Sequence, residues 1–292
     1  MISAERSDHW HSGKFLAGFV SETEAVQAMA NGVEHATSIE SIRKTWADSA
    51  QRVRTRSPTS LAVDLLGFPN DTSSELETAL DKVKKRLSGD PQLSGNPWSF
   101  NLVGIEGLVS IQKQVNVTMA NQLADAVTDH DDLMGATKIA LLTELHSSPI
   151  AVLQDAQGVI ISSPDLNLSL MGAGVIEGQN DLGDKIKSAT LSFGCLQSYV
   201  RIVHFGGRYF VRDGYHRIYA LKQKGFTHVP AIVIESTNPA EVIPPGNLFP
   251  LPTVLSDNPP LFSDFDDNAV DVKIPKLNKV IRVRFEPFIV PS

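Results

Sequence analysis

The feature that most constrains the fold is YFVRDGYHRIYALKQKGFTHVPAIVIE, residues 209–235, in which two apolar runs flank a short polar turn. The run that ends at Arg212 predicts a strand, residues 215–224 predict a helix, and HVPAIVIE predicts another strand. Gly225 suits the left-handed position that follows a helix. A chain with this order of elements must build a mixed α and β structure, with the turn at the end of a strand.

The turn concentrates residue types that suit an anion. Asp213 is a preferred N-cap residue, and Gly214 would let a ligand approach the backbone closely. The free amides and the dipole at the start of a helix stabilise a negative charge. Arg217 could hold two phosphate oxygens at once, and His216 could donate to the same group or transfer a proton. The alternative is structural: a capped helix, a tight turn and an arginine paired with a nearby acid.

The charge distribution favours a local anion site over a general nucleic-acid surface. The formal net charge of −7 argues against broad, non-specific binding of nucleic acid. Between residues 201 and 228, however, six basic side chains are opposed only by Asp213, so six minus one gives +5 for this stretch. It supplies Arg201, Arg208 and Arg212 as possible supporting residues for a phosphate. The alternative interpretation is a solvated basic face.

Composition bounds the class of protein. With 292 residues and 42% hydrophobic content, the chain can bury the core of one large or two modest domains. Its apolar runs are too short to cross a bilayer, and its first residues lack a secretory signal, so no membrane partner is expected. Cys195 is the single cysteine, which fits a reducing cytoplasm. The acidic stretches DHDD and DFDDN lack the calcium-loop pattern, and we expect no metal site.

Three regions are predicted along the chain. Residues 1–96 form a helical N-terminal region that ends in the breaker-rich stretch SGDPQLSGNP. Residues 97–238 form the domain that contains the turn, and a glycine-rich stretch from Leu170 to Lys187 is expected to be a loop. Residues 239–292 form an extended proline-rich arm that ends in the candidate strand KVIRVRFEPFIV.

Smaller elements follow from periodicity. Apolar residues at helical spacing predict helices over Thr23–Asn31, Ser38–Arg54 and the stretch ELETALDKVKKRL. Alternation predicts an interrupted strand over 109–117, with helices after it from about Thr118 to Val127 and from about Leu133 to His146. Two β-rich runs around Asp155–Gly158 predict a hairpin.

The stretch DGYHRIYALKQKGFTHVPAIVIE resembles the ParB/sulfiredoxin-like superfamily, of the ParB-like nuclease domain type. In that superfamily a strand, a G-x-[HR]-R turn, a helix, a glycine and a VP-x-x-V strand recur in this order. The resemblance is strong over Val200–Glu235 and weaker over Gln112–Val127. It implies an α+β fold with a small mixed sheet and flanking helices, to which this chain adds the helical N-terminal region and the C-terminal arm.

The resemblance also implies a site. In the superfamily the turn binds nucleotide phosphates, so Gly214, Tyr215, His216 and Arg217 are expected to contact phosphate, with Asp213 shaping the turn. The implied ligand is ATP or CTP with Mg²⁺. If the protein is an enzyme, phosphoryl transfer or phosphate hydrolysis is the expected reaction class, and the candidate catalytic residues are His216, Arg217 and Asp213.

Two departures from the superfamily argue against two of its functions. Sulfiredoxins carry a reactive cysteine where this chain has Tyr215, so reduction of a sulfinic acid is not expected. Partition-type ParB proteins continue into a helix-turn-helix domain, whereas a proline-rich segment follows Glu235 here. The alternatives are a DNA-associated ParB-like protein or nuclease, and a non-enzymatic scaffold that forms a homo-oligomer through its C-terminal arm.

Overall fold

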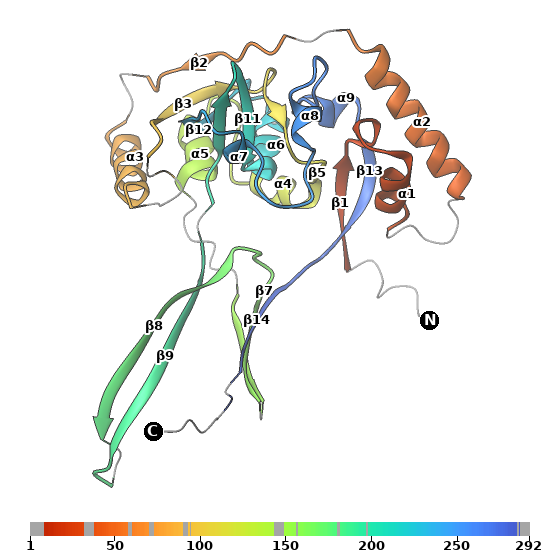
Figure 1. Cartoon of the computed structure of the whole chain (residues 1–292). Helices are drawn as coiled ribbons and strands as arrows, with labels where there is room; N and C mark the ends of the chain where they lie inside the picture. Colours follow the sequence, from red (N-terminus) through yellow and green to blue (C-terminus); the bar gives the residue numbers. More distant parts are fainter. Residues whose placement is uncertain are drawn as a thin grey trace. The chain divides into compact units, whose positions relative to one another are not determined.

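The computed structural model divides the chain into two compact units (Figure 1). Unit 1 comprises residues 1–144 and 199–275, and unit 2 comprises residues 145–198 and 276–292. The structure describes residues 9–31, 38–57, 60–69, 73–89, 93, 95–142, 149–155, 157–179, 182–196, 198–284 and 286. Together the units make a mixed α+β protein, as the order of predicted elements required.

The main sheet of unit 1 has six strands in the order β2-β3-β12-β10-β11-β4. It is mixed, because β10 pairs antiparallel with β11 but parallel with β12, and β11 pairs parallel with β4. The bounds are β2 Leu65–Leu66, β3 Trp98–Gly104, β4 Val109–Ser110, β10 Arg201–Phe205, β11 Arg208–Asp213 and β12 His228–Glu235. The strands predicted on both sides of the turn are therefore confirmed and lie in one sheet.

The predicted helices of unit 1 are confirmed within a few residues. Serine side chains cap three of them, since Ser21, Ser38 and Ser73 each accept a hydrogen bond from the amide three residues later. The helix expected to reach His146 is described only as far as Leu142, and its later residues lie outside the described part. The bounds are η2 Ala17–Phe19, α1 Glu22–Ala30, α2 Ile39–Thr55, α3 Ser74–Leu87, α4 Val117–Ala124, α5 Leu133–Thr137, η3 Lys138–Leu142 and α6 Tyr215–Gln223.

A second sheet in unit 1 has the order β13-β1-β5, with bounds β1 Trp10–Phe15, β5 Gln114–Asn116 and β13 Val270–Pro275. Since β1 pairs with β13 over six residues and with β5 over three, the N-terminal region is part of the same unit as the turn. The predicted boundary at residue 96 is therefore wrong. Figure 1 shows α1 and α2 beside this sheet.

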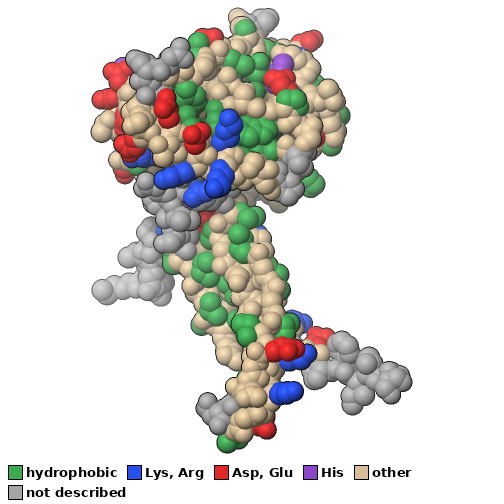
Figure 2. All heavy atoms as spheres, turned by 90° about the vertical axis from the view of Figure 1, so that its left-hand side faces the viewer, with side chains coloured by type: hydrophobic (Ala, Val, Ile, Leu, Met, Phe, Trp, Pro, Cys, Tyr) green, Lys and Arg blue, Asp and Glu red, His purple; other side chains and the backbone are tan. Residues whose placement is uncertain are grey.

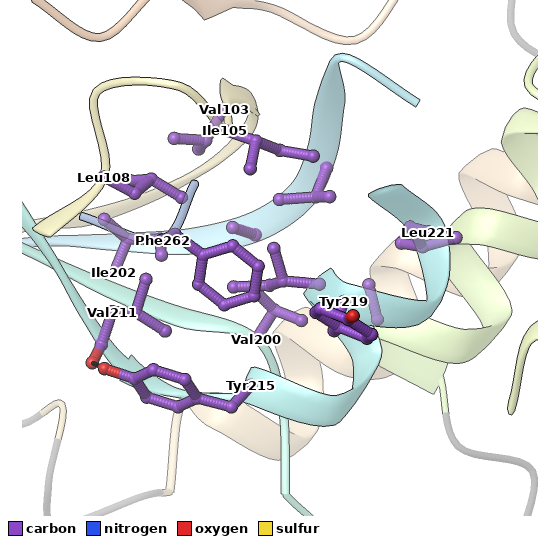
Figure 3. Close-up of a cluster of buried hydrophobic side chains, with 14 of the residues drawn as sticks. Val103, Ile105, Leu108, Val200, Ile202, Val211, Tyr215, Tyr219, Leu221 and Phe262 are labelled. Atoms are coloured by element: carbon purple, nitrogen blue, oxygen red, sulfur yellow. Dashed lines mark hydrogen bonds between the residues drawn. The ribbon is translucent and has the colours of Figure 1, made fainter. Parts of the chain in front are cut away.

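The core of unit 1 joins the main sheet to α6 (Figure 3). Val103 and Ile202 come from the sheet, Tyr215 and Leu221 come from α6, and all are at least 98% removed from solvent. Phe262, from the segment between β12 and β13, packs between them with a relative exposure of 0%. The core therefore packs the sheet and α6 together on both sides of the turn.

The region after residue 239 is not an extended arm. It forms the short helices α7 Pro239–Val242, α8 Leu251–Val254 and α9 Asp264–Asp267, then β13. Six of its apolar side chains are buried against the main core: Val242, Phe249, Val254, Leu261, Phe262 and Phe265. Their burial outweighs the tendency of the prolines to keep the chain extended.

Unit 2 interrupts the domain that was predicted over 97–238. It contains a sheet of order β14-β7-β6, with β6 Ala151–Asp155, β7 Gly158–Ser163 and β14 Lys279–Arg284, which confirms the hairpin at Asp155–Gly158. It also contains a long hairpin of β8 Leu168–Gln179 and β9 Lys185–Cys195. The predicted loop from Leu170 to Lys187 is therefore wrong, because cross-strand pairing offsets the low strand propensity of its glycines.

The C-terminal strand is used within the chain. β14 pairs antiparallel with β7 over six residues, from Lys279 opposite Ser163 to Arg284 opposite Gly158. One edge of β14 is therefore not available to a neighbouring subunit in the way that the scaffold hypothesis supposed. Among the helices that the structure describes, none is both long and apolar enough to cross a membrane.

Candidate functional site

The turn after β11 has the expected shape, shifted by one residue. β11 ends at Asp213, and Gly214, rather than Asp213, occupies the N-cap position of α6 with φ +93°. The Gly214 amide donates to the Asp213 carboxylate at 2.7 Å, and the Gly214 carbonyl accepts from the amides of Arg217 and Ile218 at 3.0 Å. The carboxylate of Asp213 therefore already accepts the hydrogen bond of the Gly214 amide, which was expected to bind an anionic ligand.

Gly214 is required for packing inside the protein. A β-carbon at this position would lie 2.8 Å from the Cα of Val200, and φ lies in the left-handed region that favours glycine. We expected glycine here because it would make room for a ligand. The structure gives a different reason: Val200, just before β10, packs closely against Gly214.

Tyr215 points into the core, as Figure 3 shows. Its hydroxyl accepts hydrogen bonds from the amides of Ile111 and Gln112, at 2.7 and 3.1 Å, and donates to the Val211 carbonyl at 2.9 Å. Burial raises the pKa of Tyr215 to about 12. The Tyr215 hydroxyl thus links α6 to β11 and to the segment Ile111–Gln112. Because the side chain is buried, only the backbone of Tyr215 could contact a ligand.

His216 is largely buried and lies near His11 of β1. Burial, together with the positive charges of Arg217 and His11, lowers the pKa of His216 to about 4. The imidazole is therefore neutral at pH 7, where it could accept a proton but would rarely carry one to donate. This electrostatic contact connects α6 with β1, which holds His11.

A pocket of about 340 Å³ lies beside the end of β11. Two arginines contribute to it, and they come from adjacent strands, because Arg201 is the cross-strand partner of Asp213, the residue after Arg212. Opposite them lies the proline-containing segment after α7, whose Leu248 forms a β-bridge with Gln112. The lining residues are Gln112, Arg201, Arg212, Asp213, Pro244, Pro245, Gly246 and Leu248.

The pocket has a positive balance. Two guanidinium groups against the one carboxylate of Asp213 give +1 among its lining residues, that is, two minus one. Burial lowers the pKa of Arg212, and the neighbouring charge of Arg201 acts in the same direction, while Asp213 and Glu241 oppose the shift. An arginine that is half-buried near a like charge would gain from an anionic ligand.

The structure divides the predicted site residues. Arg201, Arg212 and Asp213 line the pocket, whereas Gly214, Tyr215, His216 and Arg217 are not among its lining residues. Arg208, at the other end of β11, donates to the carbonyls of Val254 and Ser256 at 3.1 and 2.8 Å and so fastens the C-terminal segment to the sheet.

Sequence reasoning missed two parts of the pocket. Gln112 was noted only as the start of the weaker resemblance over Gln112–Val127, and that resemblance was the signal that could have found it. The segment Pro244–Leu248 gave no signal, because its position depends on the apolar residues that follow it, such as Phe249, whose amide donates to the Ile111 carbonyl at 2.9 Å.

The acidic stretches have structural roles. In DFDDN, the two carboxylate oxygens of the buried Asp264 accept from Nη1 of Arg56, at 2.6 and 2.5 Å, and Asp264 also accepts from the amide of Leu261 at 2.7 Å. In DHDD, Asp132 caps α5 by accepting from the amide of Gly135 at 2.7 Å. Within the part of the chain that is described, no cluster of three or more His, Cys, Asp or Glu is arranged to hold a metal ion.

Comparison of the chain with protein-family models, with curated proteins and with solved structures finds no match.

Proposed function

We propose that this protein binds the phosphate groups of a nucleotide in the pocket lined by Arg201 and Arg212. The observation that carries the proposal is that two arginines from adjacent strands share one pocket, with one of them half-buried. Planar guanidinium groups bind phosphate oxygens in pairs, and this binding strengthens where water is partly excluded.

The other lining residues suit a nucleotide better than a bare inorganic anion. Gln112 offers both a donor and an acceptor, and Pro244, Pro245 and Leu248 provide an apolar wall for a sugar or base. Asp213 would repel an isolated phosphate, but its carboxylate suits the Mg²⁺ that accompanies ATP or CTP. The resemblance to the ParB/sulfiredoxin-like superfamily supports the same ligand class.

The proposal is for binding, with phosphoryl transfer or phosphate hydrolysis as the reaction class that such a ligand would allow. His216 and Arg217 do not line the pocket, so a catalytic role for either requires a ligand that extends along α6. At neutral pH, His216 would act as a proton acceptor rather than a donor, because burial lowers its pKa to about 4.

Isothermal titration of the full chain with ATP, CTP and inorganic phosphate, each with and without Mg²⁺, tests the proposal. Arg212→Gln should weaken binding at least about tenfold, because a charge-assisted hydrogen bond is lost. Lys224→Gln is the matched control: it removes the same charge from the same basic stretch but lies outside the pocket. No heat with any ligand, or equal loss in both variants, would refute a site at this pocket.

A further inference from the structure

Unit 2 exposes an unusual amount of apolar surface. Eighteen large hydrophobic residues are exposed in the described part of the chain, and fourteen of them belong to unit 2. Figure 2 shows hydrophobic side chains at the surface of this part of the chain. In the β8–β9 hairpin alone, Val175 is 68% exposed and Ile176 is 58% exposed. Monomeric proteins rarely leave contiguous apolar patches of this kind uncovered, so the hairpin requires an explanation.

The pairing register sorts the side chains of the hairpin onto two unlike faces. Cross-strand partners share a face, and alternate residues along a strand lie on opposite faces. One face, which we call the apolar face, is apolar at every position from the root of the hairpin to Val175. Its exposed part consists of the pairs Leu170 with Phe193, Ala173 with Leu191, and Val175 with Ala189. Leu168, paired with Cys195 at the root, continues the apolar pattern but is fully buried and does not contribute to the exposed surface.

The opposite face, which we call the polar face, is built largely from small and polar residues, and its large apolar side chains are the exposed Met171, Ile176 and Ile186. Its pairs are Ser169 with Gly194, Gly172 with Ser192, Gly174 with Thr190, Ile176 with Ser188, and Gly178 with Ile186. A strand pair that is buried on one face and solvated on the other has this alternation. Among the described residues, however, the hairpin is a two-stranded sheet, and such hairpins are marginal alone in water.

We propose that the apolar face packs against the same face of a second copy of this chain, about a two-fold axis parallel to the hairpin. Under that symmetry β8 of one copy faces β9 of the other, so each apolar pair meets an apolar pair. Just beyond the apolar face, Glu177 and Lys187 form an ion pair at 2.8 Å. The two-fold axis places Glu177 of each copy opposite Lys187 of its partner, so the charges are complementary as well.

The size of the contact sets the strength expected. The exposed part of β8, from Leu170 to Gln179, spans roughly 33 Å, and two strands with their side chains are about 10 Å wide, so two copies cover on the order of 650 Å². Stable interfaces bury about 1,200 Å² or more. We therefore expect a weak dimer that dissociates on dilution.

Sedimentation velocity of the full chain over about 1 to 200 µM tests this assignment. The wild-type mass should rise from 31.7 kDa towards twice that value as the concentration increases. Val175→Glu should weaken dimerisation at least about tenfold, because it places an unpaired charge within the apolar face. Ile176→Glu is the matched control on the same strand, since it makes a similar change at the neighbouring, exposed position of the polar face and should change the dissociation constant by less than about twofold.

A second pair on β9 keeps the test independent of one substitution. Leu191→Glu should act like Val175→Glu, and Thr190→Glu should act like Ile176→Glu, with circular dichroism confirming that all four variants stay folded. A wild-type protein that remains monomeric at 200 µM would overturn the proposal. It would also be overturned by polar-face variants that dissociate the dimer as strongly as apolar-face variants, because edge-to-edge pairing would then explain the contact.

Discussion

Replacing Tyr215 by phenylalanine removes one oxygen atom from the best-connected position of the turn. The ring keeps its packing in the core, but the amides of Ile111 and Gln112 lose their acceptor and the Val211 carbonyl loses a donor. Leaving a buried polar group without a partner costs about 1–3 kcal/mol. Ser110, whose hydroxyl donates to that of Tyr215 at 3.4 Å, also loses this partner but keeps the Gln112 carbonyl as an acceptor at 2.8 Å.

From these contacts we expect Tyr215→Phe to lower the free energy of unfolding by about 3 kcal/mol. Urea denaturation followed by tryptophan fluorescence would measure the change. Tyr209→Phe is the control, because Tyr209 lies on β11, is only partly buried, and stacks on His204 with ring centroids 4.3 Å apart. It should cost less than about 1 kcal/mol.

The same substitution should also affect the pocket, because the hydrogen bond to the Gln112 amide fixes a lining residue. We expect nucleotide affinity to fall several-fold at temperatures where the variant remains folded. A loss of stability below about 1 kcal/mol for Tyr215→Phe would refute the reasoning, since it would mean that water or rearrangement satisfies the three freed groups.

Two further predictions concern the same turn. Gly214→Ala should destabilise the protein by about 3 kcal/mol or more, because it adds both a clash with Val200 and a strained φ, whereas Gly206→Ala, with φ +57° and open space, should cost only about 1 kcal/mol in thermal unfolding. His216 should make stability depend on pH: its pKa is lowered on folding from 6.5 to about 4, so the unfolded chain binds the proton more tightly, and stability that is complete above pH 6.5 is lost as the pH falls towards 4. The loss should reach about 3 kcal/mol, and His216→Gln should remove it, as urea titrations at several pH values would show; an unchanged slope in the variant would contradict the assignment.

Local signals in the sequence predicted local structure well. The strand before Asp213, the helix that follows it and the stop at Gly225 are confirmed, and Gly225 has φ +89°. Helical periodicity placed α1, α2 and α3 within a few residues. These features depend on interactions between residues close in sequence, so a short stretch contains the information that determines them.

The candidate site was predicted only in part, because contacts between distant segments built it. The sequence indicated Arg201, Arg212 and Asp213, but the meeting of Gln112 with Leu248 depends on how the C-terminal segment folds back. Proline content suggested an extended arm there, and burial of distant apolar residues such as Phe262 reversed that expectation.

Sequence alone thus determined the order of strand, turn and helix and the excess of positive charge around the turn, whereas the need for glycine at position 214 comes from its packing against Val200. Tertiary structure decided which groups can meet a ligand: it turned Tyr215 into the core, directed His216 towards β1, and left Arg201 and Arg212 in one pocket. The physical reason is that backbone conformation depends on neighbours along the chain, whereas the exposure of a side chain depends on whatever packs against it from elsewhere.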